Sequence, residues 1–386
     1  MITRDSDDTI AGSEPVSWAV GQLQEALDGV ATAVPQILVA GPSSAQAGTL
    51  LAQASATLPE APESLALARI GDTIVAAGRD ERGLVYAVLD LTDRLRHAGS
   101  PAEALRLERS VVEQPANAIR SVARLFTSEV EDKIWWYDRD FWEAYLTELA
   151  THRFNRFALT LGLGYNFPRG VTDDYLHFTY PFLLDVPGYD VRATNLPDDE
   201  RDRNLATLQF IGQEVKRRGL HFQLALWTHA YEWVDSPHAT YPIQGLNAGN
   251  HAPYCRDALR LLLEKVPTVD GLTYRVHGES GIPEGSYDFW RTVFEGVVDA
   301  SRQLGRPLEI DRHAKGVDQE TIDVALATGL PVNISPKYWA EHQGLPYHQA
   351  SIREIERTAP PKQGHMAISS GERRHSRYGY TDLLRE

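Results

Sequence analysis

The first part of the chain alternates short apolar runs with amphipathic stretches. Apolar residues at helical spacing predict three helices, over residues 14–28, 44–56 and 81–97. Short apolar runs between turn residues predict three strands, over residues 36–40, 73–77 and about 104–112. Strands that alternate with helices favour a small α/β sandwich. We place this domain at residues 1–115, because Glu113-Gln114-Pro115 breaks the pattern.

From residue 119 the pattern becomes regular, with apolar strands separated by amphipathic helices. The predicted strands cover residues 119–126, 156–162, 221–227, 271–277, 307–313, 331–335 and 365–369. The predicted helices cover about 138–152, 201–218, 253–265, 286–304, 318–328 and 348–357. This spacing implies parallel strands, and so many units in one run favour a (β/α)8-type TIM barrel over residues 116–386.

The strand count stops at seven, whereas a barrel of this type needs eight. The last residues, RRHSRYGYTDLLRE, read as the start of a seventh helix. An open barrel exposes a parallel edge, which parallel sheets rarely tolerate. We therefore expect a barrel truncated after its seventh strand, as the product of a longer protein. The alternative is that a neighbouring segment covers the gap.

Composition narrows the class of protein. The chain has 53 acidic against 38 basic residues and a net charge of −15, which argues against nucleic-acid or anionic-membrane partners. Cys255 is the one cysteine, so no intrachain disulfide can form. The start, MITRDSDDTIAGSEP, lacks the basic and apolar regions of a signal peptide, and no apolar run approaches the ~18–20 residues of a membrane span. We expect a cytoplasmic protein, and the sequence leaves its oligomeric state open.

The segment at residues 71–95, GDTIVAAGRDERGLVYAVLDLTDRL, resembles the end of the N-terminal domain shared by α-glucuronidases and β-N-acetylhexosaminidases. The matching positions are Gly78, Arg82, Gly83 and Tyr86. We expect Gly78 to end a strand at a turn that needs positive φ, and Gly83 to let a helix pack closely on the sheet. The resemblance implies this domain followed by a catalytic barrel.

A second segment, TYRVHGESGIPEG at residues 273–285, resembles the strand-4 loop that carries the acid in xylan α-glucuronidases. Glu279 and the surrounding glycines and proline are the positions that carry over. Hexosaminidases place an Asp-Glu pair after this strand, whereas this chain has Gly278-Glu279, which counts against a hexosaminidase. The α-glucuronidases carry their base carboxylates on late strands, but the sixth strand here, NISPKYW, has no carboxylate.

Hydrolysis of a glycosidic bond usually needs two carboxyl groups, which a barrel presents at the carboxyl ends of its strands. We expect Glu279 to be the general acid, with a structural salt bridge as the alternative. Glu372, after the strand at 365–369, is the candidate base, unless it caps a helix; Glu341 is its rival. Asp311 lies inside a strand, where it serves either catalysis or a structural ion pair.

Cations and aromatic side chains at predicted strand ends are candidates for substrate binding. Arg124, Arg275 and Lys337 either bind the carboxylate of a uronic acid or balance Asp311 in the barrel interior. His277 either contacts the sugar, tunes the nearby Glu279, or is structural. The aromatic candidates end the third and sixth strands, with core packing as their alternative: Trp227, His229, Tyr338 and Trp339. The insertion at residues 164–198, with Tyr165, Asn166, Arg169 and Tyr180, is expected to form a lid or subsite wall, or else to pack on the first domain.

Other chemistries find little support in the sequence. It has no Gly-x-Gly-x-x-Gly, P-loop or Gly-x-Ser-x-Gly motif, and its histidines are scattered, so we expect no cofactor and no metal. The leading hypothesis is a glycoside hydrolase that acts on a terminal sugar, including a uronic sugar. The alternatives are a non-catalytic carbohydrate-binding or assembly protein on a degenerate barrel, and metal-assisted hydrolysis. A separation above about 12 Å between the carboxyl groups of Glu279 and Glu372 would weaken the hydrolase hypothesis, because catalytic pairs stand ~5–9.5 Å apart.

Overall fold

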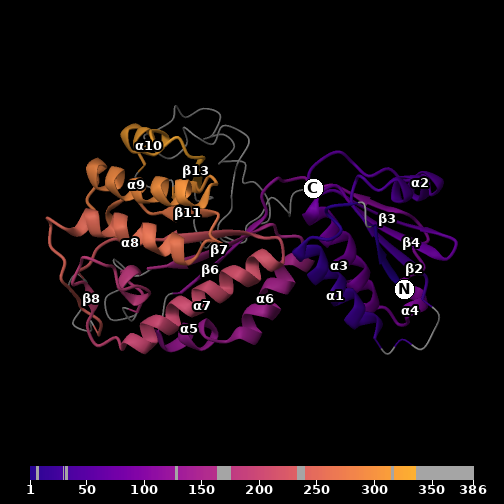
Figure 1. Cartoon of the computed structure of the whole chain (residues 1–386), viewed down its shortest axis with the longest axis horizontal. Helices are drawn as coiled ribbons and strands as arrows, with labels where there is room; N and C mark the ends of the chain where they lie inside the picture. The colour runs from indigo at the N-terminus through magenta and orange to yellow at the C-terminus, as the bar shows by residue number, and fades with distance from the viewer. Residues whose placement is uncertain are drawn as a thin grey trace, which may run out of the picture. The chain divides into compact units, whose positions relative to one another are not determined.

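The computed structural model describes residues 1–5, 8–28, 30, 34–126, 129–162, 175–232, 240–313 and 317–335. The chain divides into two compact units. The first comprises Met1–Arg120, Glu143–Asn155 and Glu214–Leu220, and the second comprises Ser121–Trp142, Arg156–Gln213 and the chain from His221 onward. Figure 1 labels most of the elements of both units. The linear domain boundary at residue 115 stays a prediction.

The first unit is built on a five-stranded sheet in the order β1-β2-β4-β3-β5. Strands β1, β2 and β4 run parallel, and β3 is antiparallel to both β4 and β5. The strands are β1 (Ile2–Arg4), β2 (Gln36–Ala40), β3 (Leu65–Ile70), β4 (Thr73–Gly78) and β5 (Val111–Glu113). The helices are α1 (Glu14–Leu27), α2 (Ala45–Gln53), α3 (Glu81–His97) and α4 (Pro101–Ala104).

Both faces of this sheet are apolar, because successive side chains along a strand point to opposite faces. One set of strand residues packs with α1 and α3: Ile37, Val39, Leu65, Leu67, Ile74 and Ala76. The alternate set packs with α2: Leu38, Ala40, Ala66, Ala68, Val75 and Ala77. Helices therefore cover the two faces of the sheet, and the α/β sandwich expected from the sequence is confirmed.

Two glycines of the 71–95 segment, Gly78 and Gly83, allow close packing at the start of α3. A Cβ atom on Gly83 would lie under 3.0 Å from the carbonyl oxygen of Ser64, just before β3, so the close approach expected of Gly83 is confirmed. Gly78 does end a strand, as expected, but the expected reason for a glycine there, a positive φ, is wrong. Its φ is not in the left-handed region, and a Cβ atom there would instead collide with the backbone of Leu84.

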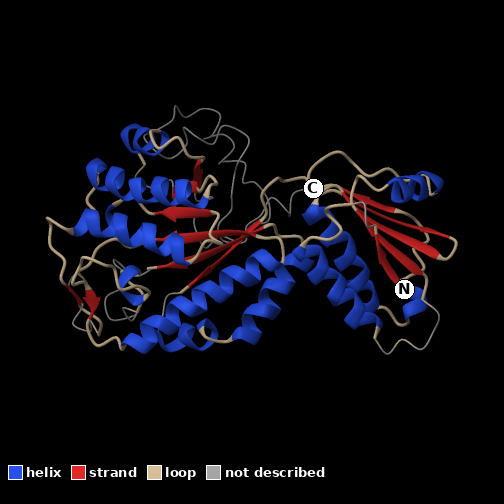
Figure 2. Cartoon of the chain, viewed as in Figure 1, coloured by secondary structure: helices blue, strands red, loops and turns tan. Residues whose placement is uncertain are grey.

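The second unit contains a parallel six-stranded sheet in the order β13-β12-β11-β9-β7-β6, with helices beside it (Figure 2). Its strands are β6 (Ser121–Leu125), β7 (Arg156–Leu161), β9 (His221–Leu226), β11 (Gly271–Tyr274), β12 (Glu309–His313) and β13 (Val332–Ser335). Its α-helices, two of which extend into segments of the first unit, are α5 (Glu129–Trp136), α6 (Arg139–Thr151), α7 (Asp198–Arg217), α8 (His251–Lys265), α9 (Tyr287–Leu304) and α10 (Gln319–Leu326). Within the described residues the strands follow one another in sequence order around the sheet, as in a (β/α) barrel, and they do not close.

Most predicted elements are confirmed within a few residues, and some were missed. The sequence did not predict β1, β3 or α5, and the strand expected near 104–112 is limited to β5 at Val111–Glu113. The predicted helix at 348–357 and strand at 365–369 lie outside the described residues. A short antiparallel ladder, β8 (Arg192–Ala193) with β10 (Ile243–Gln244), was also not predicted. None of the helices in the described ranges is long and apolar enough to cross a membrane.

Strand register separates two faces of the sheet in the second unit. One face meets the helices, since Tyr274 packs on Trp290 and Phe294 of α9. The opposite face, here called the inner face, carries the registered residues Thr160, Ala225, Thr273, Asp311 and Asn333. Side chains that continue this alternation past the strand ends form the candidate site.

Candidate active site

Three neighbouring strands bring their last inner-face side chains together. Trp227 follows β9, Arg275 and His277 follow β11, and His313 ends β12. The guanidinium of Arg275 lies 4.1 Å from the ring centroid of Trp227, a cation–π distance. The ring of His313 lies 6.0 Å from Trp227 and 5.9 Å from His277. Because the carboxyl ends of parallel strands meet at one edge, residues far apart in sequence meet here.

Glu279 lies beside this group in a single 3₁₀ turn, Gly278–Ser280. Its side chain is 29% exposed, and its Oε2 lies 3.0 Å from Nη2 of Arg275 and 3.6 Å from Nε2 of His277. The main-chain N–H of Glu279 donates to Nδ1 of His277 over 3.2 Å. Arg275 therefore stabilises the charged carboxylate at the mouth of the sheet.

His229 was expected to bind substrate, but its side chain is fully buried. It packs against Tyr274, Phe289 and Trp290 on the helix side, and its Nε2 lies 3.2 Å from Oη of Tyr180. Burial, with a smaller effect of His251, lowers the pKa of His229 to about 3, so its ring is neutral. This placement corrects the expectation that His229 lies open to a substrate, because its ring belongs to the aromatic core.

Arg124 lies on the face opposite to Asp311, so the expected pairing of these two residues in the barrel interior is wrong. Register places Arg124 beside Leu159, on the helix-covered face. Its guanidinium lies 4.0 Å from the ring centroid of Trp135 and 4.6 Å from that of Phe141. Arg124 thus packs between sheet and helices, and does not join the cations at the strand ends.

Asp311 lies on the inner face and is 3% exposed. Its carboxylate accepts hydrogen bonds from Oγ1 of Thr273 over 2.7 Å and from Oγ of Ser335 over 2.6 Å. Thr273 in turn accepts from Nε2 of Gln223 over 3.0 Å. These contacts join β9, β11, β12 and β13 and satisfy the buried carboxylate with hydrogen bonds. The ion pair or catalytic role expected for Asp311 stays a prediction.

Several predicted site residues lie outside the described residues, so their roles stay predictions: Lys337, Tyr338, Trp339, Glu341 and Glu372. The separation of Glu279 from Glu372 is therefore not tested. Tyr165, Asn166 and Arg169 of the insertion also lie outside the described residues. Tyr180, from the same insertion, is described and is fully buried. In the described part of the chain, no group of three or more His, Cys, Asp or Glu side chains is arranged to hold a metal ion.

Sequence reasoning missed the main-chain contacts that hold the Glu279 turn. The carbonyl oxygen of Ser280 accepts from the backbone N–H groups of His229, over 2.9 Å, and Ala230, over 3.1 Å. Gly281 then leaves the turn with φ +78°, a left-handed conformation that glycine adopts without strain. Only the glycine after Ser280 signals such a turn in the sequence.

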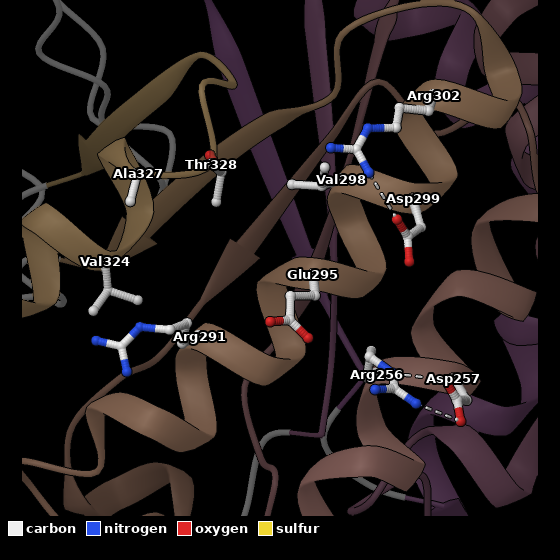
Figure 3. A pocket seen from close by; sticks show the side chains of 10 residues that line it. All are labelled: Arg256, Asp257, Arg291, Glu295, Val298, Asp299, Arg302, Val324, Ala327 and Thr328. Carbon is white, nitrogen blue, oxygen red and sulfur yellow. Dashed lines mark hydrogen bonds and ion pairs between the residues drawn. The ribbon is translucent and has the colours of Figure 1, made fainter.

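A cavity of about 600 Å³ lies on the helix layer (Figure 3). It is lined by side chains of α8, α9 and α10, together with the two residues that follow α10. Arg256 pairs with Asp257 and Arg302 with Asp299, and Glu295 and Arg291 add one charge of each sign. Its lining charges balance, and none of them belongs to the candidate site.

No protein-family model matches the sequence, and no curated protein matches it. Among solved structures, a GH138 enzyme targeting pectin rhamnogalacturonan II matches with a TM-score of 0.67 and 18% identity over 92% of this chain. The GH20 β-N-acetylhexosaminidase from Streptomyces coelicolor A3(2) matches with a TM-score of 0.49 and 15% identity. The match covers 87% of this chain and 70% of the hexosaminidase chain. CpGH84D matches with a TM-score of 0.49 and 11% identity, over 86% of this chain and 51% of the CpGH84D chain.

The chain spans 40% of the length of the GH138 protein. At 18% identity this likeness concerns the fold, and it agrees with the α/β sandwich and barrel-like unit described above. The specific resemblance to α-glucuronidases stays a prediction. The chain therefore shares its fold with that GH138 enzyme.

Proposed function

We propose that this chain is a glycoside hydrolase that cleaves a terminal sugar, with Glu279 as a catalytic carboxylate. The observation that carries the proposal is the position of Glu279, partly exposed after β11 and beside Arg275 and His277. In barrel enzymes the catalytic groups project from this edge of the sheet. The fold shared with the GH138 enzyme supports the same conclusion.

The contact between Glu279 and Arg275 favours an acidic substrate. A general acid must carry a proton, whereas the guanidinium 3.0 Å away stabilises the charged carboxylate. A uronic carboxylate offers Arg275 a competing partner with which it can form two hydrogen bonds. Binding of the uronic sugar would draw Arg275 from Oε2 and let Glu279 take up the proton it donates to the leaving oxygen.

In this proposal Glu372 is the base. Its carboxyl group would stand ~6.5–9.5 Å from that of Glu279 for an inverting enzyme, or about 5 Å away for a retaining one. The GH138 neighbour targets pectin rhamnogalacturonan II. We therefore propose oligosaccharides of that pectic polysaccharide as the first natural substrates to test.

A non-catalytic carbohydrate-binding protein is the second candidate. The observation that favours it is the ion pair between Arg275 and Glu279, which keeps the carboxylate charged and so suits binding without proton transfer. In that case the ion pair between Arg275 and Glu279 orients the arginine, and no proton is transferred.

The decisive experiment compares Glu279→Gln with wild type on aryl glycosides, aryl uronides and oligosaccharides from rhamnogalacturonan II. We expect turnover to fall by at least ~10³-fold, most for poor leaving groups, because general acid catalysis contributes 10²–10⁴-fold. The matched control is Glu284→Gln, which changes an exposed glutamate of the same loop and should keep wild-type turnover.

Two outcomes would count against the enzyme. Equal turnover in Glu279→Gln and wild type would remove Glu279 from the mechanism. A wild-type protein that binds these oligosaccharides in calorimetry, but cleaves none of them, would favour the binding protein.

A further inference from the structure

We infer that His277 is a positioning residue that holds Glu279 at two points, its main-chain N–H and its carboxylate. This inference rests on the proposed role of Glu279 and adds a specific role for its neighbour. His277 is the N-cap of the Gly278–Ser280 turn, and its Nδ1 accepts the N–H of Glu279 over 3.2 Å. Its Nε2 lies 3.6 Å from Oε2 of the same residue.

The first contact determines where the imidazole carries its proton. A ring nitrogen that accepts a hydrogen bond must have a free lone pair, so Nδ1 is unprotonated. The ring proton then lies on Nε2, the nitrogen nearer to the carboxylate. At 3.6 Å this second contact is longer than a hydrogen bond, and it acts on Glu279 as an electrostatic attraction.

Burial keeps the ring of His277 in this orientation. Its side chain is 3% exposed, and it lies between the turn and the ring of His313. Arg275, whose side chain is 8% exposed and stacks on Trp227, approaches the same Oε2. Two nitrogen groups therefore meet one carboxylate oxygen, which sets the direction in which Glu279 points.

The other side of the turn is held independently of the His277 side chain. The carbonyl of Ser280 accepts the backbone N–H groups of His229 and Ala230, and Ser280 is fully buried. The Ser280 side thus depends on main-chain bonds to the segment after β9, whereas the Glu279 side depends on the side chains of His277 and Arg275. Side-chain changes at His277 should therefore alter the orientation of Glu279 while the Ser280 contacts persist.

Two substitutions separate the functions of the two ring nitrogens. The side-chain oxygen of His277→Asn can replace Nδ1 as the cap acceptor, but nothing replaces Nε2. The amide of His277→Gln reaches the position of Nε2, but leaves the turn without its cap. We expect His277→Asn to keep the capped turn and to lower kcat by about 10- to 100-fold with KM nearly unchanged, because a small misplacement of a catalytic group has this effect.

We expect His277→Gln to lower Tm by about 2–4 °C, the effect of losing a cap. Per folded molecule, His277→Gln should have a higher kcat than His277→Asn. Glu284→Gln again serves as the control that leaves both kcat and Tm unchanged. A His277→Asn variant with the kcat of wild type would overturn the inference. The inference would also fail if KM and kcat decreased in parallel with Tm in both variants.

Nitrogen NMR tests the inference without any enzyme assay. With ¹⁵N-labelled histidine, and His277 assigned by its loss in His277→Asn, we expect an unprotonated Nδ1 and a protonated Nε2 at neutral pH. A protonated Nδ1 would overturn the inference whatever the protein catalyses. Absence of turnover in the wild type, with the expected NMR result, would count against the proposed hydrolase alone.

Discussion

Asp311 shows how the barrel-like sheet accommodates a carboxylate that solvent scarcely reaches. A buried carboxylate is costly unless it is hydrogen-bonded. The hydroxyls of Thr273 and Ser335, one from each neighbouring strand, donate to its two oxygens. The contribution of Asp311 is therefore expected in stability, with activity affected only through the amount of folded protein.

Asp311→Asn tests this assignment. The amide nitrogen of asparagine cannot accept the proton of the hydroxyl that faces it, and the mismatch should reduce the free energy of unfolding by about 1–3 kcal/mol. Urea titration measures this loss, and turnover per folded molecule should stay within a few-fold of wild type. A variant with wild-type stability and a large loss of turnover would instead place Asp311 in the chemistry.

The same residues show which parts of the candidate site the sequence could predict. Glu279 and Arg275 follow directly from the position of a strand end, and the structure brings them together. The faces on which Arg124 and His229 lie were not predictable, because a strand buried on both sides has no polar face to show which side meets the helices. Pairing between strands that are distant in sequence, as between β6 and β7, decides it for Arg124.

At the scale of single elements, α3 shows how a sequence motif positions a helix. Oδ1 of Asp80 caps α3 by accepting the N–H of Gly83 over 2.9 Å, and its Oδ2 accepts the N–H of Glu63 over 2.8 Å. Glu63 has φ +62°, a conformation uncommon outside glycine. The cap thus joins the start of α3 to the bend before β3, and the missing Cβ of Gly83 lets them approach.

Gly83→Ala should therefore destabilise the protein, although alanine favours helix. The added methyl would meet the backbone carbonyl of Ser64, which cannot move without disturbing β3. We expect a loss of about 1–3 kcal/mol in the free energy of unfolding, the range for overpacked sites. Chemical denaturation of the purified variants measures the change.

Gly21→Ala in α1 is the matched control, because beyond its own stretch of helix backbone nothing lies within 4 Å of the added methyl. Here helix propensity alone should act and stabilise the protein by up to about 1 kcal/mol. Equal changes in unfolding free energy for Gly83→Ala and Gly21→Ala would show that close packing at Gly83 does not affect stability.

At the scale of the whole chain, regular repeats were predictable and short or locally ambiguous elements were not. The strands and helices from β6 to β13 carry long apolar runs at clear spacing, and most were placed within a few residues. The three residues of β1 are too few to show a period, and the alternation of Leu and Ala in β3 also suits a helix. In these cases hydrogen bonding to neighbouring strands decides the structure.

A buried polar cluster in the first unit connects segments that the sequence separates widely. Glu63 lies at its centre and forms ion pairs with Arg82, over 3.0 Å, and with Arg120, and it accepts from Nδ2 of Asn155 over 2.8 Å. Oη of Tyr86 accepts from Nη2 of Arg120 over 3.3 Å. Arg82 and Tyr86 belong to the motif behind the family resemblance, so the motif contributes to a cluster that holds this unit together.

The pH dependence of the unfolding free energy of Glu63→Gln should show how much this cluster contributes to stability. Burial alone would raise the pKa of Glu63, but Arg120, Asn155 and Arg82 outweigh it and hold the pKa below its usual value. A lowered pKa in the folded state stabilises the protein above the unfolded pKa of about 4.3, and this contribution is lost as pH falls through the folded value. We expect Glu63→Gln to lose about 3 kcal/mol of unfolding free energy at neutral pH, as for a broken buried pair, and less near pH ~3.5.

Urea titrations of wild type and Glu63→Gln at both pH values measure the difference. Glu60→Gln is the control, because its ion pair with Arg79 is largely exposed and should contribute little at either pH. If wild type and Glu63→Gln lost the same unfolding free energy between the two pH values, the carboxylate of Glu63 would not be the group whose charge stabilises the cluster. The two curves should instead converge on acidification, because protonation removes from the wild type the charge that the substitution has already removed.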